Sequence, residues 1–135
     1  MDTNFKGKIT ELKVLTYITE LGYSVSIPFG NKDRYDQIWD INGKLIKVQV
    51  KTAHWKTLEQ KAIIFKCKST SNGKDHKYTK DDIDFFATYW QNQCYLIPVE
   101  CCSTEKTLWF SSPANGCSRC AKAEDYIVEE VLKQI

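Results

Sequence analysis

The chain has 135 residues, of which 42% are apolar and 27% are charged, with a formal net charge of +2. This length suits one domain with a core of its own, so we expect a single domain over residues 1–135. No apolar run is long enough to cross a bilayer, which excludes a membrane-spanning segment and gives no reason to expect a membrane partner.

The first predicted elements are a helix and a strand. Apolar residues recur at about 100° per residue over residues 4–21, which is the helical period, and Gly22 supplies a natural stop. Residues 23–29 then alternate between apolar and polar side chains, which is typical of a strand.

Residues 34–52, RYDQIWDINGKLIKVQVKT, predict a hairpin. Asn42-Gly43 is typical of a two-residue type I′ turn, because both central positions need a positive φ. This turn fixes the register, so that Asp36 lies opposite Gln49. The two-residue period of a strand places Lys51 on the same face as Gln49. The three polar side chains are therefore expected to form one cluster.

The middle of the chain predicts a strand, a loop and a helix. Residues 62–68 are mostly apolar and predict a strand, whereas residues 69–77 are polar and rich in turn formers, which indicates a loop. Thr79 with Asp82 resembles a helix-capping box, and the apolar residues from Ile83 to Trp90 have helical spacing. We therefore expect a helix here.

Two strands, over residues 94–100 and 107–110, and a closing helix over residues 119–134 complete the chain. Pro98 suggests that the first of these strands lies at a sheet edge. Residues 111–116 interrupt the pattern. The order of elements predicts an α/β fold, with a mixed sheet flanked by helices.

Glu11 is a carboxylate on the apolar face of the first helix, where it shares a stripe with Leu15 and Ile18. Burying an unpaired carboxylate costs several kcal/mol, so such a group needs a partner. A salt bridge to Lys51 would supply one. A divalent metal ion is the other explanation.

A Mg²⁺ site fits the polar cluster, because this ion takes oxygen ligands and is often held by one or two carboxylates together with substrate phosphate. We expect Asp36, the Gln49 amide oxygen and the Val50 carbonyl as ligands, with Mn²⁺ as a substitute ion. Glu11 would hold metal-bound water. Lys51 would orient or activate the attacking water and stabilise charge on the scissile phosphate.

Asp36 followed by Gln49-Val50-Lys51, with a helical Glu11 ahead, resembles the signature of the PD-(D/E)XK nuclease superfamily. Gln49 stands where most members have Glu or Asp, which removes one negative charge from the site. The segments GKITE, IPFG, RYDQIWD, GKLIKVQVKTA, YLIPVE and AEDY are similar to the group I intron-associated homing endonucleases of this superfamily, over about residues 5–128.

This resemblance implies a restriction-endonuclease-like fold, Mg²⁺-dependent hydrolysis of DNA phosphodiesters and homing-type double-strand cleavage. It also implies assembly into a homodimer or homotetramer. Two alternatives stay open. The first is a nuclease like the Holliday-junction resolvases, and the second is a DNA-binding module whose catalytic site has decayed.

Basic residues are concentrated in the first part of the chain, where residues 1–80 hold fifteen Lys and Arg against eight Asp and Glu. Nearly all of them are lysines, which suit sequence-tolerant contact with phosphates, although a solvated surface would have the same composition. Trp55 and Tyr78 are expected as aromatic neighbours of the DNA. The expected DNA contacts are Lys8, Lys47, Lys56, Lys61, Lys66, Lys68, Lys74, His76 and Lys77.

The six cysteines do not favour a zinc site. Cys117 and Cys120 have a knuckle-like spacing, but the other pair, Cys101-Cys102, lacks the usual two-residue spacer. The N-terminus has no signal-peptide profile, so we expect an intracellular protein, in the cytoplasm or nucleoid, whose cysteines are thiols.

Overall fold

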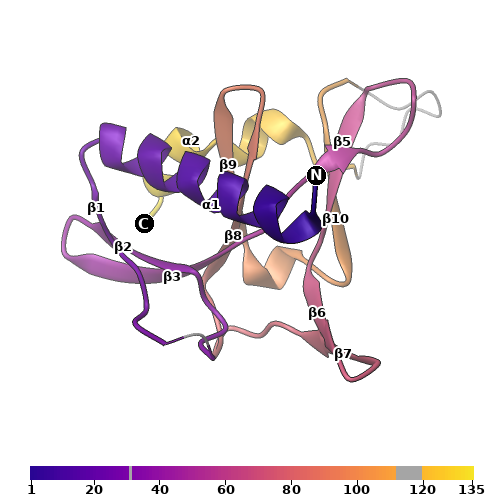
Figure 1. The fold of residues 1–135 in the computed structure, drawn as a ribbon. Helices are drawn as coiled ribbons and strands as arrows, with labels where there is room; N and C mark the ends of the chain where they lie inside the picture. Colours follow the sequence, from indigo (N-terminus) through magenta and orange to yellow (C-terminus); the bar gives the residue numbers. More distant parts are fainter. Residues whose placement is uncertain (31, 112–119) are drawn as a thin grey trace.

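Helix α1 (Thr3–Glu20) and the short helix α2 (Val128–Leu132) pack on one apolar cluster at a five-stranded sheet (Figure 1). This computed structural model describes residues 1–30, 32–111 and 120–135. None of the helices in these ranges is long and apolar enough to span a membrane. The sheet has the order β1 (Ser24–Ser26), β2 (Gln37–Ile41), β3 (Lys44–Val50), β8 (Phe85–Trp90) and β9 (Gln93–Pro98).

The five-stranded sheet is mixed, as predicted, because β3 runs parallel to β8 while the other neighbours are antiparallel. A second sheet of three strands has the order β10, β5, β4, and two further strands form a separate ribbon. Short 3-10 helices follow β9 and precede α2. The remaining elements are β4 (His54–Trp55), β5 (Ala62–Lys66), β6 (Lys68–Ser71), β7 (Lys74–Lys77), β10 (Glu105–Trp109) and the 3-10 helices Val99–Cys101 and Ala123–Tyr126.

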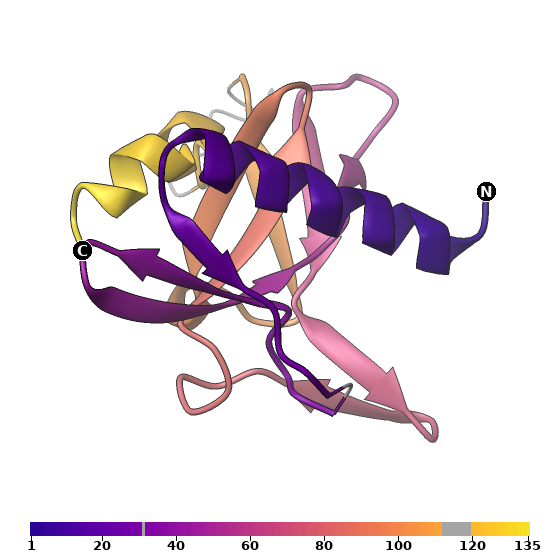
Figure 2. The same ribbon diagram turned by 60° about the vertical axis from the view of Figure 1, so that its left-hand side comes forward.

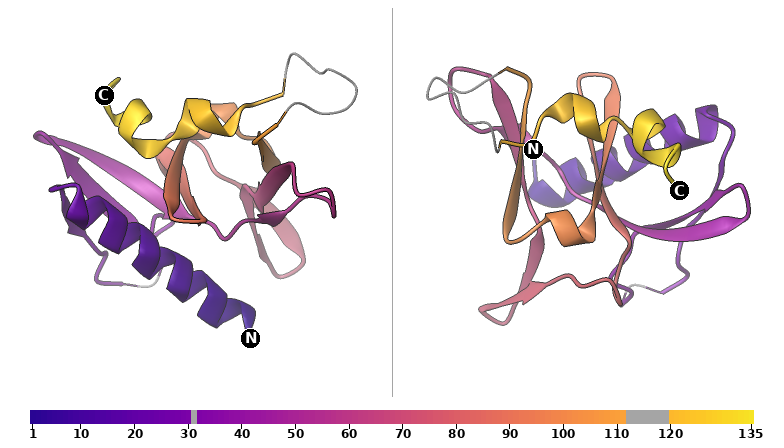
Figure 3. Two further views of the ribbon diagram at one scale, coloured as in Figure 1. Left: turned by 90° about the horizontal axis from the view of Figure 1, so that it is seen from above. Right: turned by 180° about the vertical axis from the view of Figure 1, so that it is seen from behind.

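The first core lies between the five-stranded sheet and the helices. Trp39, Ile46 and Val48 project from β2 and β3 toward Val14 and Ile18 of α1, and all five side chains are buried. Seen from above, α1 runs beside the β2–β3 hairpin and α2 lies near β9 (Figure 3). Burial of each such side chain contributes about 1.5–3 kcal/mol, so this core holds α1 in place.

The second core lies on the other face of the sheet. Phe86 and Ile97 pack there with Ile63 and Phe65 of β5 and Leu108 of β10. Strand β8 is therefore covered on both faces, which explains why it lacks the alternation of a half-exposed strand.

The β2–β3 hairpin confirms the predicted turn and register. Asn42 and Gly43 have φ values of 55° and 94°, and Trp39 pairs with Ile46 across the hairpin. The first helix is also confirmed, and Gly22 follows it with a φ of 98°, in the conformation that ends helices.

The helix predicted after Thr79 is wrong. Thr79 and Asp82 do form the local contact, because the Thr79 N–H donates to the Asp82 carboxylate at 2.9 Å, but it closes a turn. Residues 85–90, FFATYW, are rich in aromatic residues that favour strands. Gln91 and Asn92 both have positive φ and connect β8 to β9 as a tight hairpin, which helical spacing does not reveal.

The loop predicted over residues 69–77 is instead the β6–β7 ribbon, closed by a second Asn-Gly turn at Asn72 and Gly73. The ribbon projects from the body of the fold (Figure 2). The strand predicted over residues 23–29 is limited to Ser24–Ser26, ending two residues before Pro28.

The C-terminal helix is interrupted, and its predicted start lies outside the described residues, as does most of the predicted break at 111–116. Ile127 has an extended ψ of 130° and makes a β-bridge with Tyr95 of β9. Strand β9 lies at the edge of its sheet and ends at Pro98, so the prediction of an edge strand is confirmed.

Candidate active site

Asp36 contacts both neighbours of Gln49 at the end of strand β3. Its backbone N–H donates to the Val48 carbonyl at 2.9 Å, and its Oδ2 accepts from the Val50 N–H at 2.9 Å. The next residue, Lys51, donates its N–H to the Ala87 carbonyl of β8 at 2.9 Å. These contacts hold the end of β3 in place, with Asp36 facing Gln49.

Helix α1 is joined to this hairpin through Gln37, a buried amide. Its Nε2 donates to the backbone carbonyl of Glu11 at 3.0 Å, and its Oε1 accepts from Trp39 Nε1 at 2.9 Å. The side chain is only 1% exposed, so it acts as a fixed link between helix and strand. This link sets the position of Glu11 relative to Asp36.

The Glu11 carboxylate is half-buried and close enough to Asp36 to sense its charge. Desolvation raises the pKa of Glu11, the Asp36 charge raises it further, and Lys8 lowers it. No ion pair within 4.0 Å joins Glu11 to Lys51 in the described ranges. The salt bridge considered from the sequence is therefore absent, and Glu11 faces a like charge.

The charged forms of Asp36 and Lys51 are also disfavoured, because both side chains are partly buried. Burial raises the pKa of Asp36, and the Val50 N–H and the Lys51 charge oppose that shift. Burial lowers the pKa of Lys51, whereas the Asp36 charge favours its ammonium form. Lys51 Nζ donates to the Lys68 carbonyl at 3.3 Å and lies 5.2 Å from the centre of the Tyr78 ring.

The oxygen donors at this position fit a hard divalent cation. Glu11 and Asp36 are two carboxylates with raised pKa values, and the charge of Asp36 acts on Glu11, which favours a bound positive charge. The Gln49 amide makes no side-chain hydrogen bond within the described residues. No cluster of three His, Cys, Asp or Glu side chains occurs in that part of the chain, so a cation here would rely on two carboxylates, an amide and a carbonyl.

Arg34 is a site residue that the sequence reasoning missed. Its guanidinium donates to Asp82 Oδ2 at 2.8 Å and lies 3.9 Å above the Tyr78 ring. The same group reduces the pKa of Lys51 through its charge. Two features of the sequence could have indicated Arg34. It lies two residues before Asp36, which is the spacing of residues on one face of a strand, and it is one of two arginines in the chain.

The predicted DNA contacts separate into three groups. Lys8 lies close enough to Glu11 to lower its pKa, and Lys66 lies close enough to Lys51 to lower the pKa of that lysine. Lys68, Lys74, His76 and Lys77 belong to the β6–β7 ribbon. The others have partners away from the site: Lys47 donates to the Asp81 carbonyl, Lys56 donates to Thr107, and Lys61 pairs with Glu59. Trp55 packs against Trp90 and Phe110.

Cys117, the first cysteine of the knuckle-like pair, lies outside the described residues. Cys67 and Cys102 are hydrogen-bonded thiols in the second core, and this bond together with the Lys51 charge lowers the pKa of Cys67 against the effect of burial. Cys67 is therefore electrostatically coupled to Lys51.

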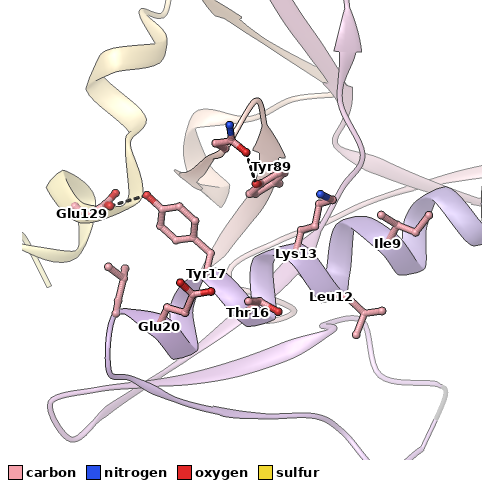
Figure 4. Close-up of a pocket in the computed structure, with 10 residues that line it drawn as sticks. Ile9, Leu12, Lys13, Thr16, Tyr17, Glu20, Tyr89 and Glu129 are labelled. Atoms are coloured by element: carbon pink, nitrogen blue, oxygen red, sulfur yellow. Dashed lines mark hydrogen bonds between the residues drawn. The ribbon is translucent and has the colours of Figure 1, made fainter.

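A groove of about 640 Å³ lies along α1 and is also lined by Tyr89 of β8 and Glu129 of α2 (Figure 4). Tyr17 donates from its hydroxyl to Glu129 at 2.6 Å beside this groove, and burial together with Glu129 raises the pKa of Tyr17 to about 12. The groove contains none of the residues of the candidate site. Its lining residues include Ile9, Leu12, Lys13, Thr16 and Tyr89.

Comparison with known proteins identifies one family. The profile of the family described as PD-(D/E)XK endonuclease matches residues 1–128. No curated protein matches the chain. Among solved structures, a bacterial homing endonuclease, I-Ssp6803I, superimposes with a TM-score of 0.78 at 22% sequence identity, covering 99% of this chain and 95% of that one. The fold predicted from the sequence is thereby confirmed.

Proposed function

Because the chain belongs to the PD-(D/E)XK endonuclease family, whose members are phosphodiester hydrolases, we propose that it is a Mg²⁺-dependent DNA endonuclease making homing-type double-strand cuts. Nucleases of this family typically use a divalent metal ion. The observation that carries the proposal is the contact of Asp36 with both neighbours of Gln49, directly before Lys51.

Asp36, the Gln49 amide oxygen and the Val50 carbonyl would hold the ion, with Glu11 beside them. A bound Mg²⁺ supplies a positive charge that polarises the phosphate and lowers the pKa of a nearby water. Because Gln49 is an amide, the groups around the ion carry only the two negative charges of Asp36 and Glu11. We therefore expect weaker affinity for the ion than a site with three carboxylates would have.

Lys51 supplies the positive charge that the protein itself contributes. Its ammonium group would face the negative charge that develops on the scissile phosphate, where a desolvated cation has its largest effect. The Lys68 carbonyl holds one N–H of the group, so two donors stay available for water and phosphate. The lowered pKa of Lys51 also suits it to exchange a proton with the attacking water.

Assembly into a homodimer or homotetramer is part of this proposal, because one site cuts one strand. The similarity in fold to a bacterial homing endonuclease supports the homing-type activity. Gln49 favours one second candidate, a DNA-binding module without cleavage, because the amide removes a charge from the ion site.

A plasmid-cleavage assay with Mg²⁺, with Mn²⁺ and with EDTA tests the proposal. We expect linear product with either ion and none with EDTA, and sedimentation should show a dimer or tetramer. Nicked product alone would contradict double-strand cleavage. Faster cleavage of a four-way junction would indicate a resolvase, and DNA binding without any product would indicate the decayed module.

A further inference from the structure

The β6–β7 ribbon, residues 68–77, is a polar arm without a core of its own. Its sequence, KSTSNGKDHK, contains no apolar side chain, and residues 70–77 are all exposed. The arm projects away from both cores (Figures 1 and 2). An isolated two-stranded hairpin is marginally stable in water, so the arm depends on the contacts at its root.

Two cations from the candidate site hold the root of the arm. Lys51 Nζ donates to the carbonyl of Lys68, the first residue of β6, at 3.3 Å. Arg34 donates to the carbonyls of His76 and Lys77, at the end of β7, at 3.2 and 2.9 Å. Both strands of the arm are thus fixed to the side chains that surround Asp36.

Arg34 is itself held firmly, which makes the attachment rigid. It pairs with Asp82 at 2.8 Å, stacks on the Tyr78 ring and donates to Ser69 Oγ at 3.3 Å. A planar guanidinium loses little further freedom in such a set of contacts. The direction of the arm relative to the candidate site is therefore fixed.

The size of the arm matches the major groove of duplex DNA. That groove is about 12 Å wide and 8.5 Å deep, and it admits a two-stranded β-ribbon. At about 3.4 Å per residue, β6 extends about 10 Å from Lys68 to Ser71, so the turn would reach the floor of the groove. Three lysines against one aspartate give the arm the positive charge that DNA attracts.

The two faces of the arm differ in their hydrogen bonding. On one face Asp75 accepts from Lys68 at 2.8 Å and from Thr70 at 3.1 Å, so these groups satisfy each other. The other face carries Ser71, Lys74 and His76, whose side chains make no hydrogen bond within the described residues. These three side chains offer donors and an acceptor to an incoming partner.

We propose that the arm enters the major groove beside the bond that is cut, and that Ser71, Lys74 and His76 contact base edges there. This inference rests on the proposed function, because the root of the arm lies at the proposed catalytic residues. It makes the arm a determinant of which DNA sequence is cut, while Lys51 and Asp36 carry the chemistry.

The test uses a random-sequence duplex pool, with cleaved sites sequenced and binding measured against salt by fluorescence anisotropy. The variant is Lys74→Ala/His76→Ala, and Lys44→Ala is the control, because Lys44 also directly follows an exposed Asn-Gly turn. We expect the double variant to lose sequence preference at one block of base pairs and its salt slope to fall by about 1. The control should match the wild type.

Each outcome decides the proposal. If the wild type cleaves or binds DNA and the double variant keeps the same sequence preference and salt slope, the arm proposal is wrong and the nuclease stands. If the wild type binds DNA without cleaving it, the binding data still decide the role of the arm. If the double variant changes only self-association, measured by sedimentation, the arm contacts protein and the proposal is overturned.

Discussion

Two hairpins of this chain close with the same Asn-Gly turn and have opposite surroundings. The β2–β3 hairpin buries Trp39 and Ile46 beneath α1, whereas the β6–β7 arm buries no apolar side chain. Their turns have similar φ values, which are 55° and 94° at Asn42 and Gly43, and 53° and 74° at Asn72 and Gly73. The turn therefore fixes the pairing of the strands, and the apolar alternation decides whether a hairpin joins the core.

The largest expected effect concerns Lys51, at the polar end of the core hairpin. Lys51→Ala should lower the cleavage rate by roughly two to three orders of magnitude, because a preorganised charge at the phosphate is lost. DNA affinity should change little. Single-turnover cleavage and anisotropy measure the two effects, and Lys44→Ala at the other end of β3 is the control. Equal cleavage by Lys51→Ala would reject its role.

The turn glycines compare the stability of the two hairpins directly. Gly43→Ala should lower the free energy of unfolding by about 1–2 kcal/mol, because the residue must keep a positive φ inside the core hairpin. Gly73→Ala has the same backbone strain, but the arm can open without unfolding the domain, so we expect less than about 0.5 kcal/mol. Urea denaturation measures both. Equal losses would mean that the arm belongs to the cooperative unit.

Asp36→Asn should stabilise the protein while it abolishes cleavage. Burial raises the pKa of Asp36, so its ionisation costs stability as the pH rises through the interval between its unfolded and folded pKa values. An amide keeps an acceptor for the Val50 N–H and removes that cost. The thermal midpoint in EDTA at pH 7 should rise by a few degrees, and the gain should vanish under acidic conditions.

Exposed Asp33→Asn is the control for this change, with an expected shift below about 1 °C. A lower midpoint for Asp36→Asn would show that the carboxylate stabilises the end of β3. That result would remove the argument that charge repulsion prepares the site for a cation.

Gln49→Glu should have the smallest effect, which is a higher affinity of the site for Mg²⁺. A third carboxylate would lower the Mg²⁺ concentration for half-maximal cleavage by roughly three- to tenfold, because ligand charge sets affinity. It should also destabilise the ion-free protein, since the new charge faces Asp36. Mg²⁺ titration of the cleavage rate measures the effect. Unchanged Mg²⁺ dependence would place Gln49 outside the ion site.

The parts that sequence reasoning predicted well depend on short-range signals. Asn42-Gly43 and the alternation around Trp39 define the core hairpin and place Asp36 opposite Gln49. The spacing of Glu11 alone places it on the inner face of the helix, and burial does raise its pKa. Both signals lie within one element.

The parts that were missed depend on distant partners or on ambiguous patterns. Apolar residues from Ile83 to Trp90 suit a helix or a buried strand, and only pairing with β3 and β9 decides for the strand. Arg34 contacts Asp82, 48 residues away, and no local pattern indicates that contact. The arm has a strong turn signal, but without apolar alternation its strands resemble a loop.

The outer strands of the five-stranded sheet limit how copies of this protein can associate. Strand β1 has three residues, and β9 ends in a proline and bridges Ile127 along its outer edge. Short or blocked edges offer few free backbone groups, so neighbouring molecules cannot readily extend the sheet into a continuous ladder. The edges of this sheet therefore resist fibrillar pairing between copies of the protein.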